Sequence, residues 1–386
     1  MIDQQHLSCD IVCLGAGMAS TSLVLALISG GYRGRIIMVE KAASSPCDRT
    51  WCFWGRQQLP AYLQSLVTKT WSHWWVGIGE QSTSHYASDG TQAYCCIKGE
   101  DFYRYASDRL SKNSNIQCLF SQPVSAVTRQ SKGVQVLAAD YRITANLCID
   151  TRPGRPRSIA STSRHAGLMQ SFYGLRLTFE QPIIDDTAVG LMENMHAEDG
   201  FYFDYRLPYS QHEVLVELTC FARQKKSMAE LKPKLLERLA INYPGLIYAV
   251  DAVEYGCLPM FTENRGCDGE ASVIHAGITA GHIRPATGYA FLPVQRWSQV
   301  AAAAILQGNR PPQFDPIPRV YYCLDAIFLR ALQDDITIAP ALFYRLVEKT
   351  TPSQLARFMT EQASISDFLS VIMAMPKRPF IRALLR

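Results

Sequence analysis

A glycine-rich turn between a strand and a helix, close to the start of the chain, constrains the fold more than any other feature. Residues 11–14 are an apolar run suited to a buried parallel strand, and residues 21–28 have the composition of a helix. Between them, Gly15 and Gly17 allow a tight turn, and the unbonded N–H groups at a helix start favour a phosphate group. The segment predicts a Rossmann-like α/β lobe.

The residues after this turn extend the pattern toward dinucleotide binding. The sixth position of the fingerprint is Ser20, where glycine or alanine is usual, and residues 35–39 form a second strand that ends in Glu40. A carboxylate at this separation accepts hydrogen bonds from a ribose. We expect the dinucleotide to contact Gly15, Gly17, Ser20, Glu40 and Lys41. An ordinary glycine turn between a strand and a helix is the alternative.

Composition and charge exclude several classes of protein. With 386 residues and 48% hydrophobic content, the chain is long enough for two or three lobes, because single domains typically stay below about 250 residues. Its 38 basic and 34 acidic residues are too evenly balanced to indicate nucleic acid as a partner. The 12 cysteines show no zinc-binding spacing and fit a reduced cytosolic protein. We expect no metal, no leader peptide and no membrane-spanning helix, which needs roughly 18 apolar residues in a row.

The rest of the chain divides by pattern into a sheet and a helical region. Residues 167–221 alternate in short strand-like pieces, as an antiparallel sheet requires, and a basic, proline-broken loop at 151–158 precedes them. From residue 314 onward, apolar residues recur at three- and four-residue spacing, which is typical of helices. We therefore expect a discontinuous dinucleotide-binding lobe at 1–105, 106–166 and 256–310, an antiparallel-sheet substrate lobe at 167–255, and C-terminal helices at 311–386.

The end of the chain has a composition of its own. Residues 375–386 are basic and apolar and contain no acidic residue. A helix of this composition can lie on an anionic bilayer surface. Docking of the same helix on the protein's own core is the alternative.

A second glycine-rich stretch and several short motifs follow one another in a specific order. The glycine-rich stretch is residues 274–293, and it repeats the strand and turn of the N-terminus. The other motifs are Arg-Thr-Trp-Cys-Phe at 49–53, Tyr-Cys-Cys-Ile at 94–97 with Phe102 beyond it, Ile-Asp-Thr-Arg at 149–152, and segments at 343–346 and 372–379. Over nearly its whole length the chain resembles the flavin-dependent bacterial lycopene cyclases. It departs from them at Arg284, where histidine is common, and at Pro153, where glycine is usual.

This resemblance implies a flavoprotein of the glutathione-reductase or hydroxylase type that binds FAD. The reduced cofactor would be the active form, with NAD(P)H as the reductant. Gly281, Thr287 and Gly288 would contact the flavin, and Thr287 and Gly288 would begin a helix directed at the dinucleotide. Arg49 and Arg152 would either bind flavin phosphates or stabilise the fold.

The resemblance also implies an activity and a location. The implied reaction is the redox-neutral cyclisation of the linear ends of lycopene, or of a related acyclic carotenoid, to β-ionone rings. Reduced flavin would act as an electron-rich surface beside a carbocation. The implied location is the cytoplasm, with peripheral attachment to the inner face of the membrane, where the polyene dissolves.

Glu217 is the candidate catalytic acid. It matches the first acid of the family's acidic strand motif and lies in an otherwise apolar run at 214–218. Burial raises the pKa of a carboxyl group, which favours the protonated form needed to donate to carbon. The next residue is Leu218, where the family usually has a second acid. A purely hydrogen-bonding role for Glu217 in the sheet is the alternative.

Aromatic side chains offer π faces that can stabilise a cation. Period-two spacing places Phe201, Phe203 and Tyr205 on one face of the sheet, and Trp51 and Trp54 lie near the flavin loop. An ordinary sheet core explains the same stripe. Three further tryptophans fit a core edge, a tunnel or a membrane interface, and these are Trp71, Trp74 and Trp75.

Two other functions are compatible with this sequence. A redox flavoprotein of the same architecture, such as a monooxygenase, halogenase or reductase, would modify a polyene or another lipophilic substrate with oxygen or a hydride. A non-catalytic carotenoid carrier would bind polyene without turnover. Product mass separates cyclisation from the redox reactions, because cyclisation leaves the mass of the polyene unchanged. A shift in absorption separates cyclisation from a carrier, which forms no product.

Overall fold

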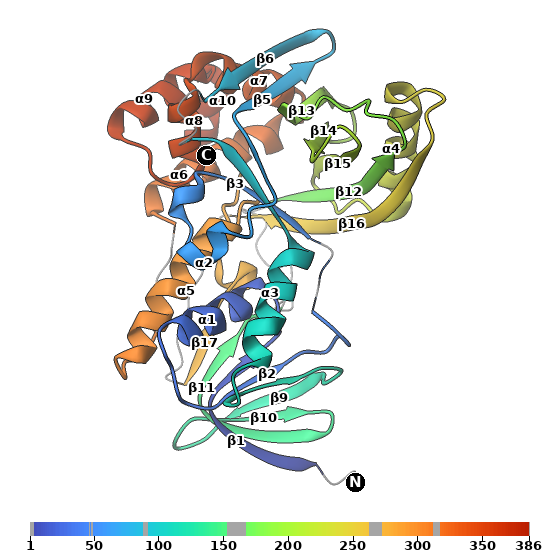
Figure 1. Ribbon diagram of the computed structural model, residues 1–386. Coiled ribbons are helices and arrows are strands. Elements are labelled where there is room, and N and C mark those ends of the chain that lie inside the picture. Colours follow the sequence, from blue (N-terminus) through green and yellow to red (C-terminus); the bar gives the residue numbers. More distant parts are fainter. Residues whose placement is uncertain are drawn as a thin grey trace.

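The computed structural model describes residues 4–45, 47, 49–87, 92–152, 167–261, 272–311 and 317–385. A mixed sheet lies at one end of the molecule, a second sheet lies at the other end, and a group of helices packs beside the second sheet (Figure 1). Pro153 and most of the basic loop expected at 151–158 fall outside the described residues.

The first lobe is built on a seven-stranded mixed sheet. Its strands are β1 (Gln5–Leu14), β2 (Ile36–Val39), β8 (Ile116–Leu119), β9 (Val124–Arg129), β10 (Val134–Ala138), β11 (Tyr141–Asp150) and β17 (Val273–His275). The strand order is β8-β2-β1-β11-β10-β9, and β17 pairs with β11. Pairing is parallel except between β9, β10 and β11, which form an antiparallel meander. Three distant stretches of the chain therefore build one sheet.

Successive side chains of β1 point to opposite faces of this sheet, and both faces are apolar. The helices of the lobe are α1 (Met18–Ser29), α3 (Gly99–Ser111) and α5 (Phe291–Leu306). Ile11 and Cys13 pack with residues of α1 and α5, whereas Val12 and Leu14 pack with residues of β10. Both faces of β1 are covered at its end, which is why its last four residues, 11–14, are all apolar and buried.

The second sheet also has seven strands and is antiparallel except at one pair. Its strands are β5 (His73–Ile78), β6 (Gln81–Tyr86), β12 (Leu168–Phe179), β13 (Ala188–Ala197), β14 (Phe201–Pro208), β15 (Glu213–Ala222) and β16 (Tyr248–Met260). The order is β16-β12-β15-β14-β13-β5-β6, with β13 and β5 parallel. The four strand-like pieces expected in 167–221 correspond to β12, β13, β14 and β15.

Two segments extend this sheet beyond the boundaries expected from the sequence. The hairpin of β5 and β6 joins it through β13, although the sequence pattern places 73–86 in the first lobe. Trp74 and Val76 of this hairpin are buried with residues of the second sheet, so tertiary packing decides where it belongs. Strand β16 continues to Met260, beyond the expected limit at residue 255, because it pairs with β12 along its whole length.

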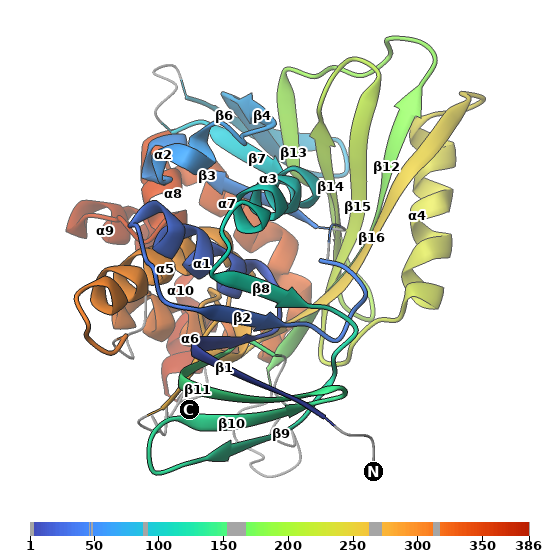
Figure 2. The ribbon, with the colours of Figure 1, turned by 60° about the horizontal axis from the view of Figure 1, so that its bottom comes forward.

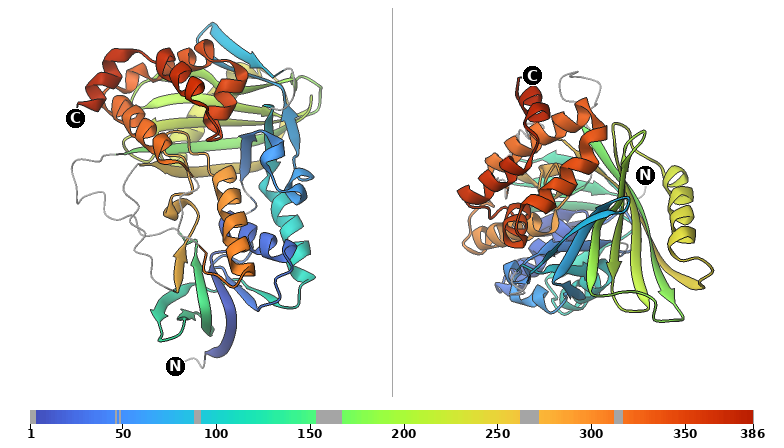
Figure 3. Two further views of the ribbon diagram at one scale, coloured as in Figure 1. Left: turned by 90° about the vertical axis from the view of Figure 1, so that its left-hand side faces the viewer. Right: turned by 90° about the horizontal axis from the view of Figure 1, so that it is seen from above.

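Different helices cover the two faces of the second sheet (Figures 2 and 3). The helix α4 (Met228–Asn242) packs on one face through Leu231, Leu235 and Leu239, which recur every four residues. The C-terminal helices lie on the other face, and they are α6 (Arg319–Asp334), α7 (Ala339–Lys349), α8 (Pro352–Met359), α9 (Ile365–Ala374) and α10 (Lys377–Leu384). The helical C-terminal region expected from the sequence is therefore present, and it packs on the substrate sheet.

Local sequence fixes where two of these helices begin. Thr351 with Gln354 forms a capping box at α8, and Ser364 with Asp367 forms one at α9. Each box satisfies two backbone N–H groups that a helix start otherwise leaves unbonded. No helix in the described part of the chain has the length and hydropathy needed to cross a membrane.

A small three-stranded sheet joins the two lobes. It consists of β3 (Thr50–Trp54), β7 (Tyr94–Lys98) and β4 (Lys69–Trp71), in that order, and α2 (Ala61–Gln64) follows β3. Phe53 packs with Phe291 of α5, whereas Trp54 and Cys96 pack with residues of the second sheet. This sheet therefore fixes how the glycine turn of the first lobe faces the second sheet.

Candidate functional site

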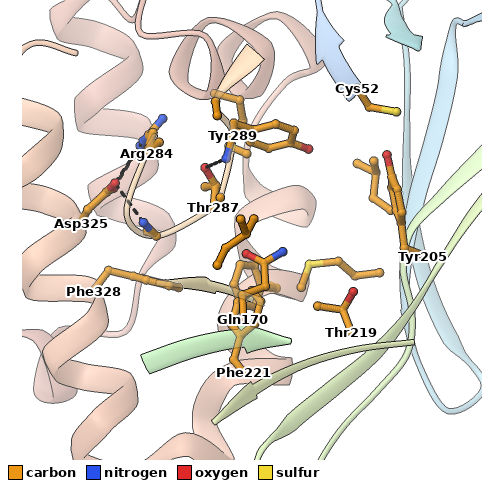
Figure 4. A pocket seen from close by; sticks show the side chains of 18 of the residues that line it. Cys52, Gln170, Tyr205, Thr219, Phe221, Arg284, Thr287, Tyr289, Asp325 and Phe328 are labelled. Atoms are coloured by element: carbon orange, nitrogen blue, oxygen red, sulfur yellow. Dashed lines mark hydrogen bonds and ion pairs between the residues drawn. The ribbon is translucent and has the colours of Figure 1, made fainter. Parts of the chain in front are cut away.

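A large cavity lies where the first lobe, the second sheet and the C-terminal helices meet. Its volume is about 1050 Å³. Gly17 and Met18 of the first glycine turn line one part of it, and Phe380 and Leu384 of α10 line another. Figure 4 shows Thr287 and Tyr289 on one side of this space and side chains of the second sheet facing them. Most other lining side chains are aromatic or aliphatic, so the cavity suits a large apolar molecule.

The first glycine turn leaves space in front of α1. Gly15 has φ +90°, and a Cβ atom there would lie 2.9 Å from Thr151 Oγ1. A Cβ atom on Gly17, at the N-cap of α1, would meet no described atom within 4 Å. This open space faces the N–H groups of the first turn of α1, as binding of a phosphate group requires.

Glu40 and Ser20 form hydrogen bonds at this turn, whereas Lys41 is exposed. Glu40 Oε2 accepts a hydrogen bond from the Ala16 backbone N–H group at 2.8 Å, so its carboxylate lies at the turn itself. The hydroxyl groups of Ser20 and Thr151 are 2.9 Å apart, and this contact ties α1 to the end of β11. Lys41 is exposed and does not line the cavity. The structure thus brings four of the five expected dinucleotide contacts together.

The two arginines expected near the flavin occupy different places. Arg49 lines the cavity immediately before β3. Arg152 forms an ion pair with Asp150 at 2.7 Å, at the end of β11. Of the two, Arg49 is the one placed to meet a ligand in the cavity.

The second glycine-rich loop reverses the chain before α5. Thr287 and Gly288 line the cavity, whereas Gly281 ends a short 3-10 turn outside its lining. The expected helix start at Thr287 and Gly288 is wrong, because α5 begins at Phe291. Gly288 has φ +73°, a left-handed conformation that a right-handed helix cannot include. The loop therefore lines the cavity at Thr287 and Gly288, and the start of α5 lines it three residues later.

Gln170 places an amide group beside this loop. Its side chain lines the cavity from β12, and its Oε1 atom is buried without a hydrogen-bond partner in the described part of the chain. A Cβ atom on Gly288 would lie 2.6 Å from this oxygen. The Gln170 oxygen can accept a hydrogen bond from a ligand N–H group, and Gly288 leaves room for a flat ligand beside it. Both features fit the ring system of a flavin.

Arg284 anchors the loop to the C-terminal helices, at the position where the resemblance leads one to expect histidine. Its Nε and Nη2 atoms contact the Asp325 carboxylate at 3.3 Å, and Nη1 donates to the Phe358 carbonyl oxygen at 2.5 Å (Figure 4). The guanidinium group packs against the Tyr321 and Phe358 rings, 4.7 and 4.5 Å from their centroids. Arg284 is only 1% exposed, so its charge is balanced inside the protein.

Three rows of side chains cross the second sheet on the face that meets the cavity. From β16 through β12 and β15 to β14, the first row is Glu254, Gly174, Glu217 and Tyr205. The second row is Gly256, Phe172, Thr219 and Phe203, and the third is Leu258, Gln170, Phe221 and Phe201. The rows place two carboxyl groups together in a wall that is otherwise mostly apolar.

Glu217 is held within this wall. Its Oε1 atom accepts a hydrogen bond from the Thr219 hydroxyl group at 2.7 Å. Burial, and next the negative charge of Glu254, raise the pKa of Glu217 to about 8, although the Thr219 hydroxyl group and Arg49 act in the opposite direction. The side chain is half-buried, because it lines the cavity. Glu217 is therefore mostly protonated at neutral pH.

Glu254 is a site residue that the sequence reasoning misses. It is 9% exposed and accepts a hydrogen bond from the Thr50 hydroxyl group at 2.5 Å. Its strand has an irregular pattern, with Val250 and Val253 exposed, and the lone glutamate in this run is the only available signal. Leu218, at the position of the family's usual second acid, lies on the opposite face beneath α4. The second carboxyl group of the site thus comes from β16.

Hydroxyl groups and aromatic rings complete the wall. The Tyr94 hydroxyl group contacts the Tyr205 hydroxyl group at 2.8 Å and the Tyr289 hydroxyl group at 2.9 Å. Burial raises the pKa of all three tyrosines, so they stay neutral and offer π faces to the cavity. Phe203 lines the cavity with them, whereas Phe201 stacks on a C-terminal helix outside its lining.

Two of the three tryptophans that the sequence left open belong to the core. Trp71 and Trp74 are 1% and 0% exposed, and Trp71 Nε1 donates to the Pro208 carbonyl oxygen at 3.0 Å. Trp75 is half-buried. Trp54 lines the cavity and is the tryptophan of β3 that faces the second sheet.

The family model described as "Lycopene cyclase protein" matches residues 10–385. The chain belongs to the lycopene cyclase family. Lycopene beta-cyclase from a Paracoccus species is 24% identical over 392 residues, which cover 96% of this chain and 95% of that protein. The family expected from the motifs is therefore confirmed, and the chain is an enzyme of this family at low identity to its relatives.

Solved structures confirm the α/β flavoprotein fold of this lycopene cyclase family member. A geranylgeranyl bacteriochlorophyll reductase-like protein from Thermoplasma acidophilum superposes with a TM-score of 0.64 at 14% identity, covering 98% of this chain and 99% of that one. The flavin-dependent monooxygenase PieE, solved in complex with FAD and substrate, gives a TM-score of 0.60 at 12% identity, covering 98% of this chain and 72% of that one. At these identities the likeness establishes the fold alone.

Proposed function

We propose that this enzyme cyclises the linear ends of lycopene, or of a related acyclic carotenoid, to β-ionone rings with FAD bound in its reduced form. One observation carries this proposal: Glu217 presents a protonated carboxyl group to a large apolar cavity. Protonation of an alkene needs a carboxylic acid that is kept neutral and dry. The family assignment and the size of the cavity support a polyene as the substrate.

Residues at both glycine-rich turns fit FAD. Gly15, Gly17 and Glu40 would hold the adenosine and diphosphate part, because they leave open space and place a carboxylate at the start of α1. The residues that would meet the ring system are Arg49, Gln170, Thr287 and Gly288. When bound and reduced by NAD(P)H, FAD supplies an electron-rich surface beside a developing cation. Ser20 and Gly281 would act indirectly, by shaping the two turns.

The side chains of the cavity account for the steps of the reaction. Glu217 donates its proton to C2 of the linear end, which creates a tertiary cation at C1, and Thr219 orients the carboxyl group. The C5=C6 double bond then attacks C1, and loss of a proton from C6 completes the ring. The rings of Tyr205, Phe203 and Trp54 stabilise the cation and exclude water. Substrate and product are isomers.

The C-terminal helices support peripheral attachment to a membrane. Leu369 and Met373 of α9 are 58% and 68% exposed, and Phe380 of the neighbouring α10 lines the cavity. The exposed basic side chains of α10 are Lys377, Arg378 and Arg382. Apolar residues flanked by basic ones fit the surface of an anionic bilayer. We infer that the polyene passes from the lipid into the cavity beside α10.

Cyclisation can be tested with lycopene in liposomes and dithionite-reduced FAD under nitrogen. The expected product has unchanged mass and blue-shifted absorption. Glu217→Gln should still bind FAD but form no ring, and Glu237→Gln, which alters an exposed glutamate of α4, serves as the matched control. A gain in mass that depends on oxygen would favour a redox flavoprotein. Stoichiometric polyene binding without turnover would favour a carrier, and ring formation by Glu217→Gln at the wild-type rate would exclude Glu217 as the acid.

A further inference from the structure

Glu217 and Glu254 face each other across one glycine. Both residues are register partners of Gly174, Glu217 on β15 and Glu254 on β16. Adjacent strands are about 4.8 Å apart, so the two backbones are on the order of 10 Å apart with only the Gly174 backbone between them. A Cβ atom at Gly174 would lie 3.2 Å from Glu217 Cβ and 3.4 Å from its Cγ. The Glu217 side chain therefore leans over Gly174, into the space that a side chain there would fill.

Each carboxyl group has its own hydroxyl donor. Thr219 donates to Glu217 at 2.7 Å, and Thr50 donates to Glu254 at 2.5 Å. Burial raises the pKa of Glu217, so Glu217 is the protonated member of the pair and Glu254 the ionised one.

Several other polar groups lie near the pair in the described part of the chain. Arg49 approaches from the segment before β3, and Tyr205 lies beside Glu217 on β14. Cys52 of β3 and Tyr209, which follows β14, lie within electrostatic range of Glu254. Only one of these groups, Arg49, is a cation. The negative charge of Glu254 raises the pKa of Glu217, so the two carboxyl groups do not both ionise readily, and the positive charge of Arg49 balances one of them.

We propose that Glu254 is a positioning residue for Glu217: the two carboxyl groups share one proton across Gly174, and the carboxylate of Glu254, held by Thr50, keeps that proton on Glu217. The catalytic part of this inference rests on the proposed cyclase function. The sharing of a proton does not, because it depends only on the resting protein.

This pairing has a consequence for the proposed reaction. When Glu217 gives its proton to carbon, two carboxylates face the new cation and attract it. Closure of the ring releases one proton from C6, and the pair takes it back. The pair thus ends each cycle with the one proton with which it began, as an isomerisation requires.

Infrared spectroscopy of the purified protein tests the pair without any polyene. Burial also raises the pKa values of Glu193 and Glu361, so the Glu217 band is isolated as wild type minus Glu217→Gln. We expect one protonated-carboxyl band in this difference, lost as the pH rises through about 8. An empty difference spectrum at pH 6 would overturn the proposal, since the proton would then not be on Glu217.

Replacement of Glu254 provides the second arm. Glu254→Gln keeps the size of the side chain but removes its charge, so the Glu217 band should be lost at a pH lower by about one unit. Glu254→Asp keeps the charge and should restore the wild-type midpoint. Glu193→Gln removes a buried carboxylate of the same sheet that pairs with Arg206 outside the cavity, and should leave the midpoint in place.

An unchanged midpoint in Glu254→Gln would overturn the proposal. If that variant does not fold, the Glu217→Gln spectrum decides, because Glu254 should then show no protonated band at pH 7. A new protonated band there would assign the proton to Glu254 and reject the pairing. In turnover assays, the basic limb of the pH profile of kcat/KM should move with the infrared midpoint. An enzyme that shows the infrared shift without ring formation would contradict the cyclase function and leave the proton-sharing pair intact.

Discussion

The carboxyl group of Glu217 stabilises or destabilises the fold according to pH. Its pKa is raised from 4.5 to about 8 in the folded protein, mainly by burial. Between these values the unfolded chain is ionised while the folded chain must hold a proton, so stability falls as the pH rises from about 4.5 to 8. The same burial that keeps Glu217 protonated for catalysis at neutral pH therefore lowers the free energy of unfolding at that pH.

We predict that Glu217→Gln removes this pH dependence. The variant should be more stable than wild type by on the order of 2 to 3 kcal/mol at pH 8, with allowance for the partial exposure of the side chain, and by less than about 1 kcal/mol at pH 5. Urea unfolding at the two pH values measures the difference, with Glu237→Gln as an exposed control. An equal difference at both values would mean that the pKa of Glu217 is not raised.

At the residue scale, the sequence predicts those features of the site that local pattern determines. Gly15, Gly17 and Glu40 follow from strand, turn and spacing, and Glu217 follows from its match to the family's acidic strand motif and from its place as a lone acid in an apolar strand. Glu254 could not be predicted, because its role depends on pairing with β12, which lies about 80 residues earlier in the chain. Its strand lies at the edge of the sheet, where exposed residues disturb the alternation that marks a strand.

At the scale of elements, the loop before α5 is held from outside the first lobe. Arg284 joins it to Asp325 of α6 and to the end of α8, and the Ala286 N–H group also donates to Asp325 at 3.2 Å. The position of Thr287 and Gly288 therefore depends on the C-terminal helices. Local sequence led to the wrong helix start here, because only the tertiary contacts of the loop reveal that Gly288 has a left-handed conformation.

We predict that Asp325→Asn destabilises the protein by about 3 kcal/mol, because it removes the nearer of the two carboxylates that balance the buried Arg284 guanidinium and leaves only Glu361, at 3.9 Å. The matched control is Asp108→Asn, which breaks an exposed ion pair with Lys112 on α3 and should cost less than about 1 kcal/mol. Urea unfolding measures both, and FAD titration of the folded variants should show weaker binding for Asp325→Asn alone. Similar losses in the two variants would contradict an anchoring role for Arg284.

At the scale of the whole molecule, the sequence predicts the order of the sheet and helical regions along the chain. It does not predict which of these regions contact one another. The hairpin at 73–86 joins the second sheet because Trp74 and Val76 are buried there, and nothing in its local pattern indicates that partner. The cavity arises from contacts among three regions far apart in the sequence, so its existence is a tertiary property. The exposed apolar residues of α9 are likewise visible only once the helix is packed.

We predict that Leu369→Glu with Met373→Glu lowers binding to anionic liposomes by roughly tenfold or more, because both apolar side chains are exposed on α9 and the substitutions add negative charge. Ile241→Glu with Ile247→Glu is the matched control. These two isoleucines are 70% and 73% exposed, in or just after α4 on the opposite side of the second sheet.

Liposome sedimentation measures the partitioning of both double variants, and FAD binding and the unfolding midpoint check that the fold is intact. Equal partitioning of the two would remove α9 from the membrane-facing surface. A loss for both would indicate a general effect of charge.

The alignment of β12 has a consequence for how uniform a preparation of this protein can be. Glu217 and Glu254 share an open space only because Gly174, which has no side chain, is paired with both of them. If β12 paired one residue out of register, Tyr173 or Leu175 would take the place of Gly174 and its side chain would fill that space. Molecules with this register error would keep their secondary structure and the glycine turn of the first lobe, but they would be inactive. Circular dichroism would not distinguish them from active molecules. An active-site titration, which gives the fraction of protein chains that are active, would distinguish them.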